Sequence, residues 1–447
     1  MTSSSSPPKA PATSPLAPAA SAQAGAGWMA WPARIGRGLL ALFSSYLLAV
    51  VVLLLLLLLT YLGTLAQQAD NLYNVQQRYF DSLFFVEDLG GVPVPLPGAY
   101  LLLAILFVNL VVGGLARMKY TWSRAGIVVT HVGMAVLLIG SFVEFQVSTK
   151  GYLALYEQEE FQDVNENGVW DPGEPFDDVD GNGQWTPGEA GSMYLSHYDW
   201  DLTLTPARSG RRTQVVLPFD ELVRAADGPV RFEGGGLPFP VEVWGWAANA
   251  RVERTPPGAT YGVNGLVLRA IPEHPEKKEH NRPGCYARLY VPGSAPIELI
   301  AWSAAKVPFR APTADGGWDV ALDKRGWVLP FEVRLDRFVR RMYPGTNMPK
   351  EYSSHITKIE HDVPEGRHIT MNEPLRHKGY ILYQSSYSTE TLPKTGRERN
   401  ISVFAVVENP ADRIPWVAVG LIFLGLLYHF GFRLVRYLGA EARRRHA

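Results

Sequence analysis

Cysteine is almost absent from this sequence, since Cys285 is the one thiol among 447 residues. A single thiol excludes an intramolecular disulfide, a CxxC redox pair and a CxxCH haem-attachment site within the chain. Net charge is nearly absent too, at −1, so no bulk attraction points to nucleic acid or another polyanion. Bulky apolar residues are scarce in the first 27 residues, which are mainly Ser, Pro, Ala and Gly. Such a stretch cannot offset its own ordering entropy, and we expect 1–37 to be disordered.

Long apolar runs, by contrast, are abundant. Roughly 20 apolar residues suffice to cross a bilayer as a helix. Four runs meet this length, and we predict transmembrane helices at 38–66, 97–116, 125–143 and 414–432. A cleavable signal peptide is the alternative for the first run, but it would need a shorter apolar core and an earlier start.

Basic residues set the expected orientation of these spans. They precede the first span, occupy the loop 117–124 and follow the fourth span in the tail 433–447 (Arg34, Arg37, Arg117, Lys119, Arg124, Arg433 and Arg436). Because Arg and Lys are enriched on the cytoplasmic side, we expect both termini and this loop to lie in the cytoplasm. The segments 67–96 and 144–413 then lie outside the cytoplasmic (inner) membrane, on its periplasmic face.

The large segment 144–413 is expected to be β-rich. It contains short alternating stretches bounded by Pro, Gly or Asp, namely "WDLTLTP", "TQVVLPF", "FPVEVWGWA", "LPFEVRLDRFV", "GYILYQSSY" and "NISVFAVVE". No long helical period competes with them. The sequence therefore predicts an integral membrane protein with four transmembrane α-helices, three N-terminal and one C-terminal. Its extracytoplasmic domain is expected to be a β-sandwich or related antiparallel layered sheet.

Two tandem loops at 163–189 follow the EF-hand ligand spacing. Each has oxygen side chains at positions 1, 3 and 5, glycine at 6, a backbone carbonyl at 7 and glutamate at 12 (Asp163, Asn165, Asn167, Val169, Glu174; Asp178, Asp180, Asn182, Gln184, Glu189). This pattern suits a hard cation, and we expect structural Ca²⁺ bound at roughly 10⁻⁴–10⁻³ M. The flanks do not read as helices, and a solvated Asp/Asn/Gly turn region is the alternative.

One histidine, His131, lies in the otherwise apolar run "GIVVTHVGMAVLLIG". On a helix, Gly126, Gly133 and Gly140 share a stripe that would let a neighbouring helix approach, and His131 lies about 140° away from it. An ionisable residue within a span is a functional hypothesis by default, and a hydrogen-bonded packing histidine is the alternative. His429 is a weaker candidate, because it lies one turn from Arg433. Asn109 is expected to hydrogen-bond between helices.

Several stretches together resemble the ResB family of cytochrome c biogenesis proteins, also called the CcsB half of System II. They are "YLGTLAQ", "LYNVQQRYFDSLFF", "VNLVVGG", "RAGIVVTHVGMAVLLIGSFVEF", "PFEVRLDRFVRRMYPGTNMPKEYSSHI" and "NEPLRHKGYILYQSSY". The resemblance covers the four spans and both ends of the outer domain. The paired loops at 163–189 depart from the family pattern and look like an insertion.

The resemblance implies a role in haem handling. Family members partner a multispan ResC/CcsA-type subunit, carry haem b across the membrane and present it for attachment to apocytochrome c. It also implies that His131 shares haem ligation with a histidine of the partner, and it leaves room for a thiol-reducing partner. The chain has no tryptophan-rich haem-handling run, so it is expected to be a non-redox assembly subunit of the synthetase that is not catalytic alone.

A second function class stays open beside this one: a membrane-anchored, calcium-braced β-domain that acts as a scaffold without a cofactor. Haem discriminates between the two. The other histidines, at 197, 274, 280, 355, 361, 368 and 377, show no metal-ligand spacing. Those at 355, 361 and 368 are expected on the surface, and Cys285 is expected to have no redox role.

Overall fold

The structure, a computed structural model, describes residues 36–68, 70, 72–88, 91–118, 120–207, 214–256, 262–274, 277–313, 316–346 and 348–445. The predicted disordered segment 1–37 therefore lies almost wholly outside the described residues, as do Arg34 and Lys119. The chain forms two compact units. One holds most of the four long helices (to residue 64, 76–138 and from 418), and the other holds 65–75 and 139–417.

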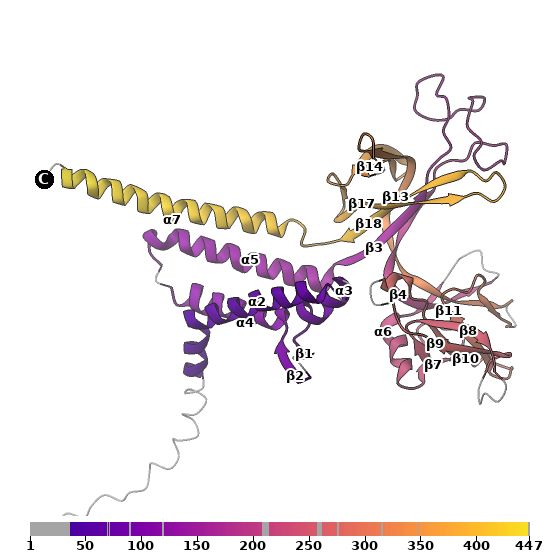
Figure 1. Ribbon diagram of the computed structural model, residues 1–447, viewed down its shortest axis with the longest axis horizontal. Helices are drawn as coiled ribbons and strands as arrows, with labels where there is room; N and C mark the ends of the chain where they lie inside the picture. The colour runs from indigo at the N-terminus through magenta and orange to yellow at the C-terminus, as the bar shows by residue number, and fades with distance from the viewer. Residues whose placement is uncertain are drawn as a thin grey trace, which may run out of the picture. The chain divides into compact units, whose positions relative to one another are not determined.

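Four helices are long and apolar enough to cross a membrane. They are α2 (Tyr46–Ala66), α4 (Ala99–Asn109) continued by the π-helical η2 (Leu110–Ala116), η3 (Trp122–Arg124) with α5 (Ala125–Val147), and α7 (Ile414–Arg445) (Figure 1). Most of their large apolar side chains are exposed, as in Leu53, Leu54 and Leu57 of α2. Exposed leucines on a helix without a polar face are typical of a surface that meets lipid. The predicted set of three N-terminal spans and one C-terminal span is confirmed.

The first span begins at Tyr46, later than the apolar run suggested, because the helix breaks at two serines. Ser44 Oγ donates to Leu40 O at 2.6 Å, and Ser45 Oγ accepts from Leu47 N at 3.2 Å, which makes Ser45 the N-cap of α2. Asn109 Nδ2 completes the break by donating to the carbonyls of Phe43 (2.8 Å) and Ser45 (3.0 Å). Asn109 therefore joins two helices, as predicted, and supplements the carbonyls at the break, where Ser45 O has only a long backbone bond of 3.5 Å from Ala49 N.

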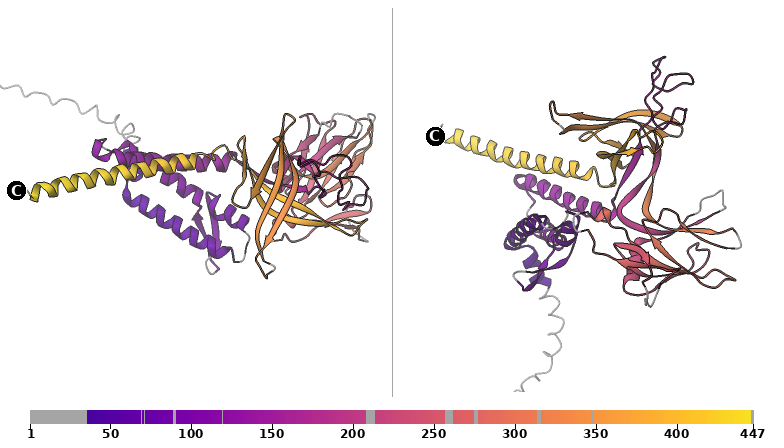
Figure 2. Two further views of the ribbon diagram at one scale, coloured as in Figure 1. Left: turned by 90° about the horizontal axis from the view of Figure 1, so that it is seen from above. Right: turned by 45° about the vertical axis from the view of Figure 1, so that its right-hand side comes forward.

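Glycines on α5 bring it into close contact with α7, and the two helices run alongside each other in both figures (Figures 1 and 2). A Cβ built at Gly126 would meet Gly425 O at 2.5 Å, and one at Gly425 would meet Thr130 N at 2.6 Å. A Cβ at Gly133 would meet Ala418 O at 2.9 Å. The predicted small-residue stripe is thus a helix–helix contact that excludes any larger side chain.

The segment between the first two spans is short and mixed in structure. It contains α3 (Leu72–Val75), the π-helical η1 (Gln76–Phe80) and a hairpin of β1 (Phe84–Asp88) and β2 (Pro93–Pro97). Tyr79 OH donates to Glu87 Oε2 at 2.8 Å and Arg78 forms an ion pair with the same carboxylate, which ties η1 to the hairpin.

All strand pairs in the second unit, the β-rich one, are antiparallel among the described residues, and the largest sheet has ten strands. Its main path runs β15-β14-β13-β4-β3-β18-β17-β16, with β12 on β13 and β5 on β4. The bounds are β3 (Thr149–Tyr156), β4 (Ala190–Pro206), β5 (Val215–Leu217), β12 (Phe309–Ala311), β13 (Trp318–Met342), β14 (Pro349–Glu360), β15 (Val363–Thr370), β16 (Leu375–His377), β17 (Tyr380–Thr391) and β18 (Glu398–Glu408).

A four-stranded sheet of order β11-β10-β7-β6 and a hairpin β8–β9 complete the unit. They comprise β6 (Val230–Phe232), β7 (Val241–Ala247), β8 (Ala250–Arg254), β9 (Leu266–Ala270), β10 (Gly284–Leu289) and β11 (Ile297–Trp302), with short helices α6 (Phe219–Leu222), η4 (Val223–Ala226) and η5 (Lys278–His280). Each of the six predicted stretches overlaps one of the observed strands, so the β-rich class is confirmed.

Two separate apolar cores hold this unit together. One gathers β5–β7, β10–β12 and α6, and the other gathers β3 and β14–β18. The long strands β4 and β13 contribute to both, with Leu202 and Leu322 in the first core and Tyr194 and Leu335 in the second. These two strands therefore link the two cores, and the shift in their register at Lys324 and Gly326 lies between the cores.

Candidate functional site

His131 lies on α5 with its imidazole against the second span. Its Nδ1 is 2.8 Å from the carbonyl oxygen of Ile127, one turn earlier on the same helix. A carbonyl can only accept, so Nδ1 carries a proton, and it is Nε2 that has the lone pair whenever the ring carries a single proton. The ring is partly buried and lies over Gly114, where a Cβ would meet His131 Cδ2 at 2.4 Å.

The segment of the second span beside His131 is π-helical. Residues Leu110–Ala116 leave the α-helical register directly after Asn109, and Gly113 and Gly114 lie in this turn. Gly113 faces Ser44, where a Cβ would be 3.1 Å from the Ser44 Cα, and Gly114 faces the imidazole. Single π turns inside α-helices are frequent at functional sites. Within this turn, the missing side chain of Gly114 leaves the room that the His131 ring occupies.

His429 lies on the other side of α5. Its backbone N and Cβ approach Gly126, where a Cβ would be 2.7 Å and 2.9 Å from them, whereas His131 faces Gly114. The structure therefore does not bring the two candidate histidines together on one face of α5. The Nδ1 atom of His429 is buried and has no hydrogen-bond partner among the described residues.

The first predicted calcium loop closes on its own glutamate. Asp163 accepts from the backbone of Asn167 (3.1 Å) and Gly168 (2.6 Å), and Gly168 has a positive φ of 77°. Glu174 accepts from the N–H groups of loop positions 2 and 9, Val164 (2.8 Å) and Asp171 (2.9 Å). Asn165 and Asn167 donate to Asp171, and the carbonyl oxygen of the Asn167 side chain accepts from Val169 N. These bonds close the first loop on itself, and its role as a cation site stays a prediction.

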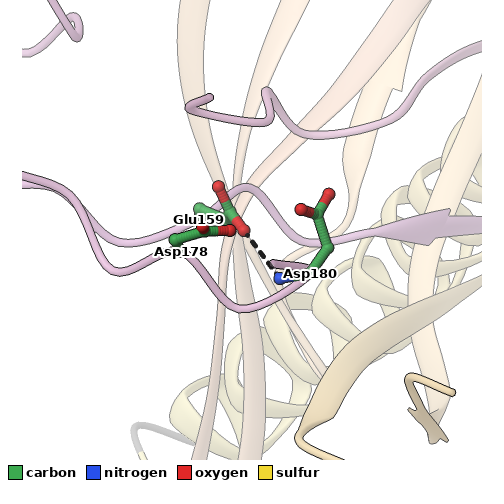
Figure 3. Close-up of side chains that lie close together, drawn as sticks. All are labelled: Glu159, Asp178 and Asp180. Carbon is green, nitrogen blue, oxygen red and sulfur yellow. Dashed lines mark hydrogen bonds between the residues drawn. The ribbon is translucent and has the colours of Figure 1, made fainter. Parts of the chain in front are cut away.

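The second loop closes on a residue outside the predicted set. Glu159 is almost fully buried and accepts from the N–H groups of loop positions 2 and 9, Val179 (2.7 Å) and Thr186 (2.9 Å), and also from Asp180 (3.1 Å). Carboxylate oxygens of Glu159, Asp178 and Asp180 lie within 4.8 Å of one another, and Figure 3 shows the bond from Asp180 N to Glu159. Asn182 and Gln184 complete the turn, in which Asn182 Oδ1 accepts from Gln184 N at 2.5 Å.

Glu189 does not close the second loop, contrary to the sequence assignment. Its carboxylate accepts from Tyr156 N at 3.1 Å, and its backbone pairs with Tyr156 and Leu335 at the start of β4. The chain enters the sheet at this point, so the side chain turns toward β3 and leaves position 12 to Glu159.

A fifteen-residue repeat explains why Glu159 replaces Glu189. Glutamates recur at 159, 174 and 189, Phe161 and Phe176 pair as an antiparallel bridge, and the two loop tryptophans stack at 5.1 Å. Trp170 Nε1 donates to Glu174 O (3.1 Å), and Trp185 Nε1 donates to Glu159 O (3.0 Å). Each glutamate therefore supports one loop in the same way, and this period was the sequence signal that could have revealed Glu159.

The remaining histidines and the thiol have defined surroundings. His355, His361 and His368 are exposed, although His355 and His368 stack across β14 and β15 with ring centroids 4.4 Å apart. Cys285 is fully buried in β10, and this burial raises the pKa of its thiol to about 12. The thiol therefore stays protonated at neutral pH, which removes the nucleophilic thiolate form.

Four apolar helices and a large antiparallel β-domain define the chain as an integral membrane protein. The family model of the ResB-like family matches residues 313–398, which include all of β13 to β17. Protein NrfI of Wolinella succinogenes is 29% identical over 113 residues, an alignment that covers 25% of this chain and 12% of that protein. The chain thus spans only a small part of this relative. Residues 313–398 are thus similar to the ResB-like family, in agreement with the resemblance drawn from the sequence.

Proposed function

We propose that this protein is the ResB-type subunit of a System II cytochrome c synthetase complex, in which it helps to carry haem b across the membrane and present it to apocytochrome c. The match of residues 313–398 to the ResB-like family supports a role in cytochrome c biogenesis. The large outer domain would be the periplasmic platform, and the basic flanks of the spans would lie in the cytoplasm. A ResC/CcsA-type membrane subunit would supply the rest of the haem site.

The observation that carries this proposal is the state of His131. The bond from Nδ1–H to the Ile127 carbonyl fixes one neutral tautomer, so Nε2 keeps the lone pair that an axial haem ligand needs. The same bond orients the ring, because a second hydrogen bond on the far nitrogen is what usually holds a ligating imidazole in place. Contact with Gly114 limits how far the ring can turn. His131 is therefore prepared as a ligand before haem arrives.

An absorption spectrum of the co-purified complex tests this role. We expect the haem Soret band of the wild-type complex to be lost or strongly reduced in His131→Ala, with the partner still bound. His355→Ala is the matched control, because it removes an exposed histidine of the outer domain and should leave the band unchanged. An unchanged band in His131→Ala would leave that histidine as a packing residue and would favour the scaffold alternative.

The paired loops suggest a second bound species, and we propose that they hold structural Ca²⁺. Hard carboxylate and carbonyl oxygens at this spacing are the donors that Ca²⁺ prefers. In the second loop the donors would be Glu159, Asp178 and Asp180 rather than Glu189. A cation there would neutralise three carboxylates that otherwise repel one another across a few ångströms.

Terbium luminescence measures this binding, because Trp170 and Trp185 lie in the loops and can sensitise the lanthanide. Glu159→Gln should weaken binding by about tenfold or more, as expected when a metal-site carboxylate is altered. Glu189→Gln is the matched control and should bind almost as the wild type does. The reverse order would restore the assignment of Glu189 as the closing ligand.

A further inference from the structure

A cleft of about 1010 Å³ lies in the β-rich unit between the two apolar cores, where β4 and β13 pass from one core to the other. Its walls include Tyr152 from β3, His197 and Trp200 from β4, Lys324 from β13 and Arg282 after η5. The volume is at the upper end of those found for small-molecule and cofactor sites. None of these residues has a role in the transmembrane site or in the calcium loops.

A large β-bulge directs His197 toward this cleft. Leu195 pairs with Gly326 and Trp200 pairs with Lys324, so the four residues 196–199 of β4 oppose the single residue Arg325 of β13. Ser196 Oγ stabilises the bulge by accepting from the backbone of Tyr198 and Asp199. Bulges of this kind turn a side chain out of the regular alternation and are common beside binding sites.

The imidazole of His197 is available for a ligand. Its ring lies 5.0 Å from the ring of Tyr152, and neither ring nitrogen hydrogen-bonds to another residue in the described part of the chain. Burial, and then the nearby Lys324 ammonium, lower the pKa of His197. The ring is therefore neutral at physiological pH, with one nitrogen lone pair unused.

The cleft also has cations that no carboxylate neutralises directly. Lys324 Nζ donates to His197 O at 3.1 Å and lies 5.0 Å from the Tyr152 ring and 5.3 Å from the Trp200 ring, with no ion pair among the described residues. Arg282 is exposed at the rim and has none there either. Of the carboxylates at the cleft, Asp201 is paired with Arg325, Asp323 accepts a hydrogen bond from Thr203 at 2.6 Å, and Glu279 lies near both cations. Lys324 and Arg282 therefore equal Asp323 and Glu279 in number, but neither cation forms an ion pair with these carboxylates among the described residues.

We propose that this cleft is a second ligand site, which takes a planar, largely apolar molecule that bears carboxylates and an imidazole-binding metal, namely a haem-type metalloporphyrin. Tyr152 and Trp200 would contact the ring system, His197 would ligate the metal, and Lys324 and Arg282 would pair with the carboxylates. The identity of the ligand rests on the proposed function, whereas the site itself lies in the β-rich unit and does not involve His131.

Hemin titration of the full-length protein in detergent tests the site in a His131→Ala background, which removes the proposed transmembrane ligand. We expect saturable 1:1 binding with the spectrum of a histidine-ligated haem. Adding His197→Gln should abolish that spectrum and weaken binding by about tenfold or more, the scale of a lost metal-site contact. Lys324→Met should weaken binding by about two- to fivefold, the scale of a partly exposed ion pair. His355→Gln is the matched control and should change nothing.

Metal-free protoporphyrin IX separates ligation from simple adsorption, because it keeps the planar ring and the carboxylates but has no iron. Its affinity should be equal with and without His197→Gln, which would support iron ligation by His197. Two results would overturn the proposal. In one, His197→Gln weakens the binding of hemin and of protoporphyrin IX equally; in the other, it leaves hemin affinity unchanged while the melting temperature is also unchanged. The result for His131 in the co-purified complex is a separate measurement, so failure of this site would leave the proposed function standing.

Discussion

The contact between α5 and α7 allows a quantitative prediction, because it depends on an absent side chain. At Gly126 a Cβ would lie 2.5 Å from Gly425 O and 2.7 Å from His429 N, and both of these are backbone atoms that cannot rotate away. Ordinary contacts lie near 3.5 Å, so Gly126→Ala must separate the helices by roughly 1 Å. Gly420, in contrast, has nothing within 4 Å of its Cβ position on the same α7.

Two opposing effects set the expected magnitude. Overpacking of a close contact costs about 1–3 kcal/mol. Alanine in place of glycine inside a helix contributes about 0.8–1 kcal/mol in the other direction. Gly126→Ala should therefore lower the free energy of unfolding by up to about 2 kcal/mol, whereas Gly420→Ala should raise it by up to about 1 kcal/mol.

Reversible unfolding of the full-length protein in mixed micelles, followed as the fraction of denaturing detergent rises, measures both variants against the wild type. The difference between the two alanine variants cancels the propensity effect and isolates the helix contact. If Gly126→Ala unfolded at the same point as Gly420→Ala, or later, then α5 and α7 would not be in the close contact described here.

Two further predictions concern hydrogen-bonded groups. Hydrogen bonds from Lys378 and His377 lower the pKa of Glu360 from 4.5 to about 2. The contribution of Glu360 to stability is therefore complete above about pH 4.5 and is lost as the pH falls toward 2. Glu360→Gln should make the melting temperature fall less steeply at acid pH, and an unchanged acid dependence would refute the assignment. Asn109→Leu removes both hydrogen bonds to the helix break before α2. It should lower the free energy of unfolding by about 1–2 kcal/mol in the same micelle assay. A variant as stable as the wild type would show that other groups satisfy the Phe43 and Ser45 carbonyls.

Local composition was enough to predict the spans and the β-rich class, because both depend on short-range patterns. The apolar runs identified all four long helices, and period-two alternation identified strands such as those in β7 and β18. The start of the first span was misplaced because an apolar count does not detect a helix cap. The pair Ser44–Ser45 was the available signal, since serine is a preferred N-cap residue.

Contacts between distant segments could not be read from the sequence. The strand order, with β13 beside β4 and β18 beside β3, depends on pairings that span more than a hundred residues. Glu159 was missed for a related reason, because it supports a loop that begins nineteen residues later in the sequence. Glu189, which is nearer to this loop, already satisfied the EF-hand ligand spacing. The tautomer of His131 required the position of the Ile127 carbonyl, although the histidine itself could be selected from its place in an apolar run.

The position of His131 on the third span depends on one short segment of the second span, which also contacts the start of the first. Asn109 holds the break before α2, the π-helical turn begins at the next residue, and within it Gly113 faces Ser44 while Gly114 faces the imidazole. A side chain at Gly114 would push the ring away from its bond to Ile127 and would release the tautomer that this bond fixes. The break, the distorted turn and the two glycines are costly features for isolated helices, since each gives up regular backbone bonding or helix propensity. Their concentration at the histidine is consistent with selection for a ligand held in one orientation, which is what shared ligation of haem with a partner subunit would require.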